Sequence, residues 1–386
     1  MENISARALL ERIVSGEPWT PEMADAAASD PNFFRDLVEP LADAFDPTLA
    51  AEYVRLFSHI VSDEIPDLRA SDLISRYERI RHPRKFDGPD PMNVFVLSRV
   101  TLGAEVAITS VVLDAALKRF PSSNIFLVAP KKSWQLFAAN QRVLLLVTPY
   151  DRGATLKQKL ALSRALATPC SGPDTIVVDP DSRLTQLGLV PICPEDRYFY
   201  LDTRSLTGPG PLSQITARWM KDTFGVAAKP WIACERDGGI AEITVSLGVG
   251  GNMEKRLPDP FERRLLEMLT ATGRNILIDK GAGGEETERV ERAIAGLPNV
   301  ETWQGEFAPF AGSIARSWLF VGYDSAGQHV AAATGTRLIT IFAGAPNERF
   351  FERWRQAGKG HIDVIRSYDR DPGKALAAVE RALASL

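Results

Sequence analysis

Short apolar runs alternate with segments of helical spacing from residue 93 to the C-terminus. The runs form two sets, at 93–98, 124–129, 143–148, 175–178 and 198–201, and then from Ile243 onward at 275–279, 299–303, 318–322, 338–342 and 361–365. A parallel pair of strands needs a long crossover connection, usually a helix, so this alternation predicts parallel sheets. We therefore expect an α/β fold with two doubly wound, Rossmann-like domains.

The chain of 386 residues is long for one hydrophobic core, which favours two or three domains. We expect an all-α N-terminal extension at 1–90, a first Rossmann-like domain at 91–228 and a second at 229–386. Pro and Gly breaks in the extension separate helices that we expect at 4–15, 20–29, 31–45, 48–61 and 71–82. No motif there carries chemistry, so we expect a helical cap or an oligomerisation surface.

The most informative motif follows the apolar run at 318–322. A turn of small residues, Asp324-Ser325-Ala326-Gly327, leads into a helix that contains His329. The free N–H groups of such a turn and the positive end of the helix dipole favour a bound phosphate. The alternative is a tight strand-to-helix turn that binds nothing.

Two further loops follow strands of the same predicted sheet. The first is rich in glycine, and its candidate ligand-binding residues are Ser246, Gly248, Gly250, Gly251, Asn252, Lys255 and Arg256. Backbone amides and a fixed cation suit a diphosphate. The second loop carries Glu285, whose carboxylate could accept hydrogen bonds from ribose hydroxyls. Because the ends of parallel strands share one edge, the three loops together predict a nucleotide-diphosphate site.

These motifs resemble glycosyltransferase family 9, the bacterial heptosyltransferase-like group with the two-domain GT-B architecture. The resemblance runs from about Asn93 to the C-terminus, and its strongest carriers are Lys255-Arg256 and the stretch from Asp324 to Gly335. It implies two Rossmann-like domains that face a cleft, the first for the acceptor and the second for the nucleotide-sugar donor.

The resemblance also implies roles for individual donor-site residues. Lys255 would contact the donor phosphates, and a glutamate near the position of Glu285 would hold the ribose. Asp324, Ser325 and His329 would frame the diphosphate. One departure is that the glycine of the family's Asp-Ser-Gly comes one place later in this chain.

A general base is implied in the loop after the first strand. The family has a Gly-Asp pair there, and its aspartate takes the proton of the acceptor hydroxyl. This chain reads Gly103-Ala104-Glu105, and one extra residue at Ala104 aligns Glu105 with that aspartate. A longer carboxylate can perform the same transfer if it reaches hydrogen-bond distance, so we expect Glu105 to be the base. The alternative is that Glu105 only caps the helix and that this copy is impaired.

Candidate acceptor-binding residues of the first domain are Arg99, Thr101, Asp179 and Arg183. Asp179-Pro180-Asp181 also matches the Asp-x-Asp metal motif of another glycosyltransferase class, but a match of three common residues is weak and Pro180 favours a turn. No His or further carboxylate stands nearby at metal-ligand spacing. We therefore expect no metal.

Composition indicates where in the cell the protein is expected and which classes of partner it could bind. The net charge is −4, yet residues 93–168 hold ten basic and three acidic side chains, which could draw the chain to an anionic membrane surface. The alternative is an ordinary solvated helix surface. Basic residues are not interleaved with aromatic ones, so we expect no nucleic acid. Three scattered cysteines and no long apolar stretch or leader favour a cytoplasmic protein.

The resemblance and the motifs together predict an inverting, metal-independent glycosyltransferase. It would move a sugar, for which ADP-heptose is the family's commonest donor, to a glycan or lipopolysaccharide-type acceptor without a cofactor. Two alternatives use the same phosphate site. One is a sugar-nucleotide epimerase of similar shape, and the other is a non-catalytic protein that binds nucleotides or glycans.

Overall fold

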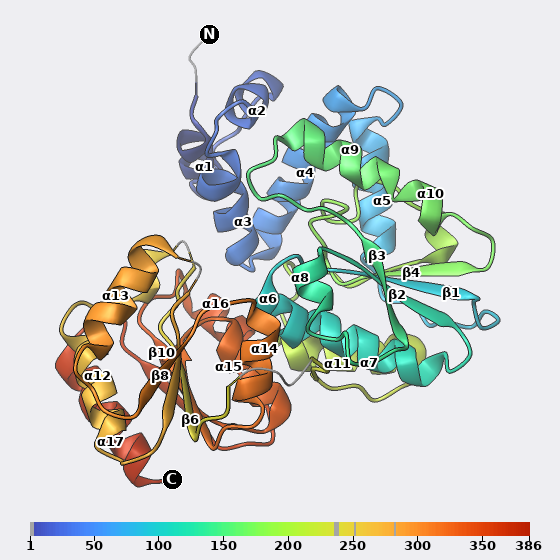
Figure 1. Ribbon diagram of the computed structural model, residues 1–386. Coiled ribbons are helices and arrows are strands. Elements are labelled where there is room, and N and C mark those ends of the chain that lie inside the picture. Colours follow the sequence, from blue (N-terminus) through green and yellow to red (C-terminus); the bar gives the residue numbers. More distant parts are fainter. Residues whose placement is uncertain (1–3, 235–238, 251, 282) are drawn as a thin grey trace.

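The computed structural model describes residues 4–234, 239–250, 252–281 and 283–386. Its first part is helical, as the sequence predicts (Figure 1). The helices of this extension are α1 (Ala6–Val14), α2 (Pro21–Ala28), a π-helix (Phe34–Val38), α3 (Glu39–Asp43), α4 (Pro47–Glu64) and α5 (Ala70–Ile80). Asp46 caps α4 by accepting hydrogen bonds from the amides of Thr48 and Leu49, which fixes the turn between α3 and α4.

The first sheet is parallel throughout and has the order β3-β2-β1-β4-β5. Its strands are β1 (Asn93–Leu97), β2 (Asn124–Ala129), β3 (Val143–Val147), β4 (Thr175–Asp179) and β5 (Tyr198–Tyr200). The accompanying helices are α6 (Leu102–Ala104), a second π-helix (Glu105–Thr109), α7 (Ser110–Arg119), α8 (Lys131–Trp134), α9 (Leu156–Ala165), α10 (Ala167–Cys170), a 3₁₀ turn (Glu195–Arg197) and α11 (Leu212–Phe224). The strand order reverses between β1 and β4, where open α/β sheets bind ligands.

The second sheet is also parallel and has the order β11-β10-β9-β6-β7-β8. Its strands are β6 (Ile243–Ser246), β7 (Ile276–Asp279), β8 (Val300–Trp303), β9 (Leu319–Tyr323), β10 (Arg337–Phe342) and β11 (Ile362–Arg366). Its helices are a 3₁₀ turn (Met253–Lys255), α12 (Phe261–Thr270), α13 (Gly284–Ile294), α14 (Phe307–Ile314), α15 (Ala326–Thr334), α16 (Glu348–Trp354) and α17 (Pro372–Ala384). Here the order reverses between β6 and β9. The prediction of two parallel-sheet domains is confirmed.

The two sheet domains touch through the loop after β1. One hydrophobic cluster contains Val106 of the second π-helix together with Phe310 of α14 and Val330 of α15. Gly103 lies against α15, because a Cβ at this position would stand 3.2 Å from Cδ2 of His329. The segment that follows the first strand is therefore held directly against the helix that follows β9 (Figure 1).

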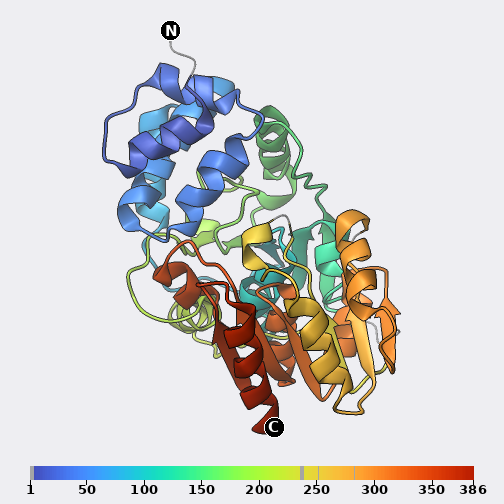
Figure 2. The same ribbon diagram turned by 90° about the vertical axis from the view of Figure 1, so that its left-hand side faces the viewer.

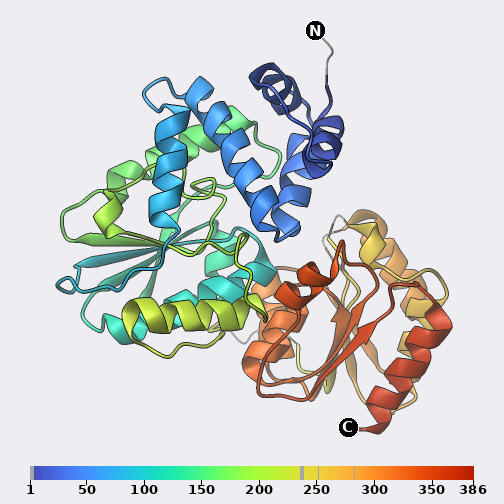
Figure 3. The same cartoon turned by 180° about the vertical axis from the view of Figure 1, so that it is seen from behind.

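The helical extension packs on the first sheet and shares its core. Tyr53, Phe57 and Tyr77 of the extension belong to one hydrophobic cluster with Phe95 of β1 and Tyr198 of β5. Figures 2 and 3 show the extension lying over this domain, with α3 directed toward the junction between the two sheets. The predicted domain limits at 90 and 228 remain predictions. No helix in the described ranges is long and apolar enough to cross a membrane.

Candidate active site

The glycine-rich loop after β6 and the turn after β9 meet at the point where the order of the second sheet reverses. Lys255 Nζ lies 2.7 Å from Oδ2 of Asp324 and stands over the ring of Phe350, 5.4 Å from its centroid. Gln328 donates a hydrogen bond to the other carboxylate oxygen of Asp324. Asp324 thus holds the lysine at the start of α15, where the cation can meet a bound anion.

The N-terminus of α15 has no side-chain cap. Ser325 is the N-cap residue, but its hydroxyl accepts no hydrogen bond from the first turn. The Ser325 Oγ is buried and has no hydrogen-bond partner within the described ranges. A helix of nine residues with an uncapped first turn and an unsatisfied hydroxyl beside a lysine is a suitable place for phosphate oxygens.

The next two residues of the turn differ in their surroundings, because Gly327 faces the sheet and Ala326 is half-exposed. A Cβ on Gly327 would come within 2.3 Å of Cζ of Phe320, so the glycine lets α15 pack on its own sheet. The contact with Phe320 therefore gives this glycine a packing role, and its part in ligand binding stays a prediction. Ala326 is half-exposed at the first position of the helix.

His329 lies one turn into α15 and is buried between the two domains. Burial lowers its pKa to about 4, although Asp324 acts in the opposite direction. Its ring packs edge-on against Trp354 of α16, with 5.9 Å between the centroids. A neutral histidine can donate one hydrogen bond but adds no positive charge to the site at neutral pH.

The carboxylate that faces the glycine-rich loop belongs to Glu286 rather than to Glu285. Glu285, the predicted ribose ligand, is exposed at the start of α13. The side chain of Glu286 lies against two glycines, since Cβ atoms on Gly248 and Gly281 would come within 2.5 and 2.3 Å of it. Both glycines therefore leave space for this carboxylate. The sequence places two glutamates side by side and offers no signal for choosing between them.

The remaining donor-loop residues differ in what their side chains do. Ser246 ends β6 and is buried, while Asn252 accepts a hydrogen bond from the amide of Glu254 at 3.0 Å. Gly250 has φ +61°, a conformation that favours glycine. Gly251 lies outside the described residues. Arg256 is turned away from Lys255 toward α12, where its Nε lies 2.8 Å from Glu262.

Glu105 is fully buried at the start of the second π-helix. Ser98 donates a hydrogen bond to Oε1, whereas Oε2 has no hydrogen-bond partner among the residues that the structure describes. Burial raises the pKa of the Glu105 carboxyl above its usual range, against the effect of the Ser98 hydroxyl. The π-helix begins directly after Ala104, and the insertion expected at that residue stays a prediction. The expected exposure to an acceptor is not present in this conformation.

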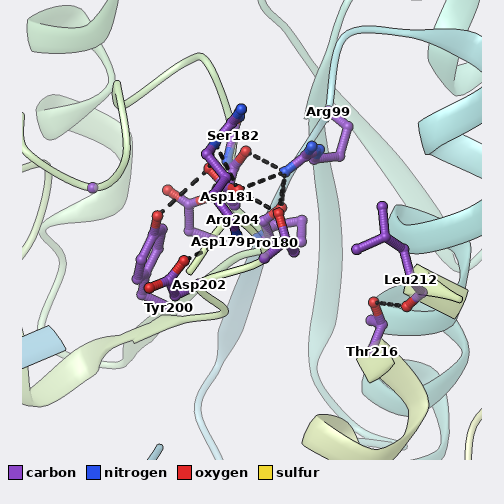
Figure 4. A network of polar contacts seen from close by, with 12 residues as sticks. Arg99, Asp179, Pro180, Asp181, Ser182, Tyr200, Asp202, Arg204, Leu212 and Thr216 are labelled. Carbon is purple, nitrogen blue, oxygen red and sulfur yellow. Dashed lines mark hydrogen bonds and ion pairs between the residues drawn. The ribbon is translucent and has the colours of Figure 1, made fainter. Parts of the chain in front are cut away.

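Arg99 belongs to a buried network that ties the ends of β1 and β4 together (Figure 4). Its Nη1 lies 3.2 Å from Asp181, which also pairs with Arg204 at 3.0 Å. The guanidinium of Arg99 further donates to the carbonyl oxygens of Pro180 and Asp181. All of these contacts are made by Nη1, and through them Arg99 positions the two loops. Thr101 is the half-buried residue before α6.

Asp179 is likewise an internal group. It accepts hydrogen bonds from the Ser182 amide at 2.6 Å and from the hydroxyls of Thr185 and Tyr198. Burial raises its pKa to about 6. Over the ranges that the structure describes, no group of three or more His, Cys, Asp or Glu residues is placed to hold a metal ion.

Arg183, the remaining predicted acceptor residue, is half-buried. Its Nη1 is buried and lacks a hydrogen-bond partner in the described part of the chain. Arg183 lies close enough to Tyr53, Tyr150 and Asp43 to influence the pKa of each. Tyr53 and Asp43 belong to the extension, where we expected no chemistry.

A cavity of about 210 Å³ lies elsewhere, between the linker after α5 and α11. Its lining includes Arg81, Tyr200, Arg218 and Trp219, and it contains none of the predicted site residues. The loops that gather the donor and acceptor candidates are therefore distinct from this cavity.

Comparison with known proteins supports the expected family. Residues 251–367 match the family model described as glycosyltransferase family 9 (heptosyltransferase). A family 9 glycosyltransferase from Veillonella parvula is 19% identical, with 72% of this chain and 87% of that chain covered at a TM-score of 0.53. The Escherichia coli heptosyltransferase WaaC, solved with ADP-2-deoxy-2-fluoro heptose, is 18% identical, with 76% and 99% covered at a TM-score of 0.58.

The E. coli ADP-heptose lps heptosyltransferase II is 15% identical, with 76% and 99% covered at a TM-score of 0.52. A search of the curated proteins found no match. The resemblance to glycosyltransferase family 9 and the GT-B fold class are confirmed by these findings. The match of 251–367 coincides with the part of the chain that carries Lys255 and Asp324, and it agrees with the prediction of a glycosyltransferase.

Proposed function

We propose that the chain transfers a sugar from a nucleotide-diphosphate donor to a hydroxyl of a glycan or lipopolysaccharide-type acceptor, with inversion at the anomeric carbon. The donor would lie along the loops after β6, β7 and β9. The observation that carries the proposal is Lys255, held 2.7 Å from Asp324 at the uncapped N-terminus of α15. Both residues lie within 251–367, the range that matches the family model.

The same residues account for the proposed departure of the nucleotide diphosphate. Negative charge grows on the diphosphate as its bond to the sugar breaks, and Lys255 and the first amides of α15 can stabilise it. Removing one preorganised donor of this kind costs about 3 kcal/mol of transition-state stabilisation. Because these groups can do the work of a divalent cation, we expect turnover to survive EDTA and to gain nothing from added magnesium or manganese.

ADP-heptose is the donor that we propose to test first. The E. coli heptosyltransferase WaaC, which has a similar fold, is solved with ADP and with ADP-2-deoxy-2-fluoro heptose. Glu286, between Gly248 and Gly281, is placed to meet a ribose hydroxyl. Glu105 is the base that the resemblance implies, and it would need to leave its buried position to reach an acceptor. A cytoplasmic location and membrane contact through 93–168 complete the proposal.

Binding of ADP, GDP, UDP and their common sugar conjugates, followed by thermal shift, tests the donor site. One nucleotide should raise the melting temperature of the wild type, and Lys255→Ala should abolish that rise. The matched control is Lys374→Ala, which removes an exposed lysine paired with Asp369 in the same domain. Absence of any shift in a folded wild type would reject the nucleotide site.

Product analysis with the donor alone separates the remaining alternatives. A transferase leaves the configuration of the donor sugar unchanged, whereas an epimerase returns an epimerised donor. Nucleotide binding without consumption of the donor, across the acceptors tried, would favour a non-catalytic binding protein.

A further inference from the structure

The turn between α3 and α4 brings the extension to the donor lysine. Phe45 packs on Phe350 of α16 with 6.4 Å between the ring centroids, and Lys255 Nζ stands over the same Phe350 ring at 5.4 Å. The Arg349 guanidinium donates a hydrogen bond of 2.6 Å to the carbonyl oxygen of Phe45 and pairs with Asp46 at 3.6 Å. Contacts from two successive residues of α16 thus fix the end of α3 beside the donor site.

Phe45 itself has an unusual backbone. Its φ is +50°, which is an outlier for a bulky side chain, and its ring is buried. Strain of this kind persists when the surrounding contacts determine the conformation, and it gathers at functional sites. The consequence is positional: the left-handed turn ends α3 at Asp43 and directs Phe45 into the cluster that also contains Ala104 and Ile108.

Asp43, the last residue of α3, is an unpaired carboxylate at this junction. Within the described ranges it forms no hydrogen bond or ion pair, and it is partly buried. Burial raises the pKa of its carboxyl and Glu39 acts in the same direction, whereas Arg183, Arg204 and Lys255 favour the charged form. Arg204 is already paired with Asp181. Asp43 can therefore interact with Arg183, whose Nη1 has no hydrogen-bond partner in the described ranges, and with a bound acceptor.

The other polar groups near Asp43 are suited to a hydroxyl-rich acceptor. Tyr150 follows β3 and lies beside the extension, because Lys159 Nζ stands 6.0 Å from the Tyr150 ring centroid and 4.0 Å from that of Phe34. Tyr150 and Arg183 are both half-buried, and Nη1 of Arg183 has no hydrogen-bond partner within the described ranges. We call Asp43, Tyr150 and Arg183 the junction cluster. It draws one member from the extension and two from the first sheet domain.

We propose that the junction cluster binds the acceptor and that Asp43, supplied by the helical extension, is the carboxylate that takes the proton of the acceptor hydroxyl. The inference rests on the proposed function. The acceptor oxygen forms a bond to the anomeric carbon, and its proton passes to Asp43. The bond from that carbon to the diphosphate oxygen breaks, and the nucleotide diphosphate keeps the electron pair beside Lys255.

This assignment distinguishes Asp43 from Glu105. Asp43 is partly accessible and lacks a protein partner, while Glu105 is fully buried and hydrogen-bonded by Ser98. A general base must reach the proton that it removes, so accessibility favours Asp43. Glu105 then acts as a positioning residue that fixes the loop after β1.

Three variants test the proposal: Asp43→Asn, Asp43→Glu and Asp63→Asn. The last makes the same substitution at an exposed position near the far end of α4 and is the matched control. The first readout is the affinity for ADP at low salt. Loss of the Asp43 charge beside Lys255 should strengthen ADP binding by roughly twofold to fivefold, because a carboxylate repels the diphosphate. Asp63→Asn should leave the affinity unchanged.

The second readout is release of ADP from ADP-heptose, with water or a glycan as acceptor. Asp43→Asn should slow release by about 10²- to 10⁴-fold, Asp43→Glu should recover most of it, and Asp63→Asn should match the wild type. Circular dichroism and thermal melting show that each variant is folded.

The outcomes separate the inference from the proposed function. If the wild type binds no nucleotide, both are rejected. If the wild type binds ADP but Asp43→Asn changes neither the affinity nor the release of ADP, the inference alone is rejected. The affinity readout decides the placement of Asp43 even when turnover is too slow to measure. Loss of turnover in Glu105→Gln with full activity in Asp43→Asn would return the role of base to Glu105.

Discussion

At the scale of single residues, the sequence offers pairs of neighbouring charged side chains, and the structure shows that only one member of each pair faces the donor loops. Lys255 meets Asp324, whereas its neighbour Arg256 is occupied by Glu262. The sequence could place both cations in a loop after a strand, but it could not tell them apart. Their partners lie on different elements, and only the folded chain determines which cation each carboxylate meets. Glu285 and Glu286 pose the same difficulty.

His329 provides a pH-dependent prediction at this scale. Its pKa is about 4 in the folded chain and 6.5 ordinarily, so both states are neutral above pH 6.5 and the full stability is present there. As the pH falls below 6.5, the unfolded state takes up the proton first, and stability is lost. We expect a loss of about 2 kcal/mol from this group between pH 7.5 and pH 5.

Urea unfolding of the wild type and His329→Gln at the two pH values measures this loss. Buried carboxyls with raised pKa values, such as Asp179, act in the opposite direction, so the difference between the two proteins is the informative quantity. His82→Gln, at an exposed position, is the control. Equal pH dependence in the wild type and His329→Gln would contradict the buried, neutral state of His329.

At the scale of elements, the sequence predicts the strands well and their contacts less well. Apolar runs mark both sheets because parallel strands are buried on both faces and read as continuous apolar stretches. The extra residue expected at Ala104 depends on a family pattern, and the structure has a π-helix that begins at the next residue with the buried Glu105. The packing role of Gly327 could not be predicted, because a sequence does not show that Phe320 lies beneath it.

Gly327→Ala is expected to destabilise the packing of α15 on its sheet. The new Cβ would meet the buried Phe320 ring, which cannot move freely in a packed core, and the cost should be about 1–3 kcal/mol of unfolding free energy. Chemical denaturation measures it. Gly208→Ala, where a Cβ meets nothing within 4 Å, should change stability by less than about 0.5 kcal/mol. Equal effects of the two substitutions would argue against the close contact.

At the scale of the whole molecule, the least predictable feature is the contact of the extension with the second sheet domain. Helical spacing predicts α4 and α5, but Arg349 and Phe45 are 304 positions apart, and no local pattern connects them. The extension lies outside the resemblance to family 9, so that resemblance gave no expectation for its placement. Its position next to Lys255 follows from the tertiary fold alone.

Binding of ADP should therefore protect the extension from hydrogen exchange. Phe45 packs on Phe350, and Lys255 stands over the same Phe350 ring, so a ligand at α15 should slow the exchange of the amides of 39–49 in the wild type. Arg349→Ala removes the hydrogen bond to Phe45 and the pair with Asp46, and it should reduce this protection. The control is Arg366→Ala, which removes an ion pair with Glu348, the neighbour of Arg349 on α16. Protection confined to the second domain would show that ligand binding at α15 is not coupled to the extension.

The core that the extension shares with the first sheet also bears on the order of synthesis. Tyr53 and Tyr77 leave the ribosome early, yet their cluster is complete only when Leu184, Tyr198 and Tyr200 have followed. Until then the apolar faces of α4 and α5 have no sheet to cover them. A nascent chain that stops before β4 would present this surface to chaperones, and the extension and the first domain should acquire protease resistance together.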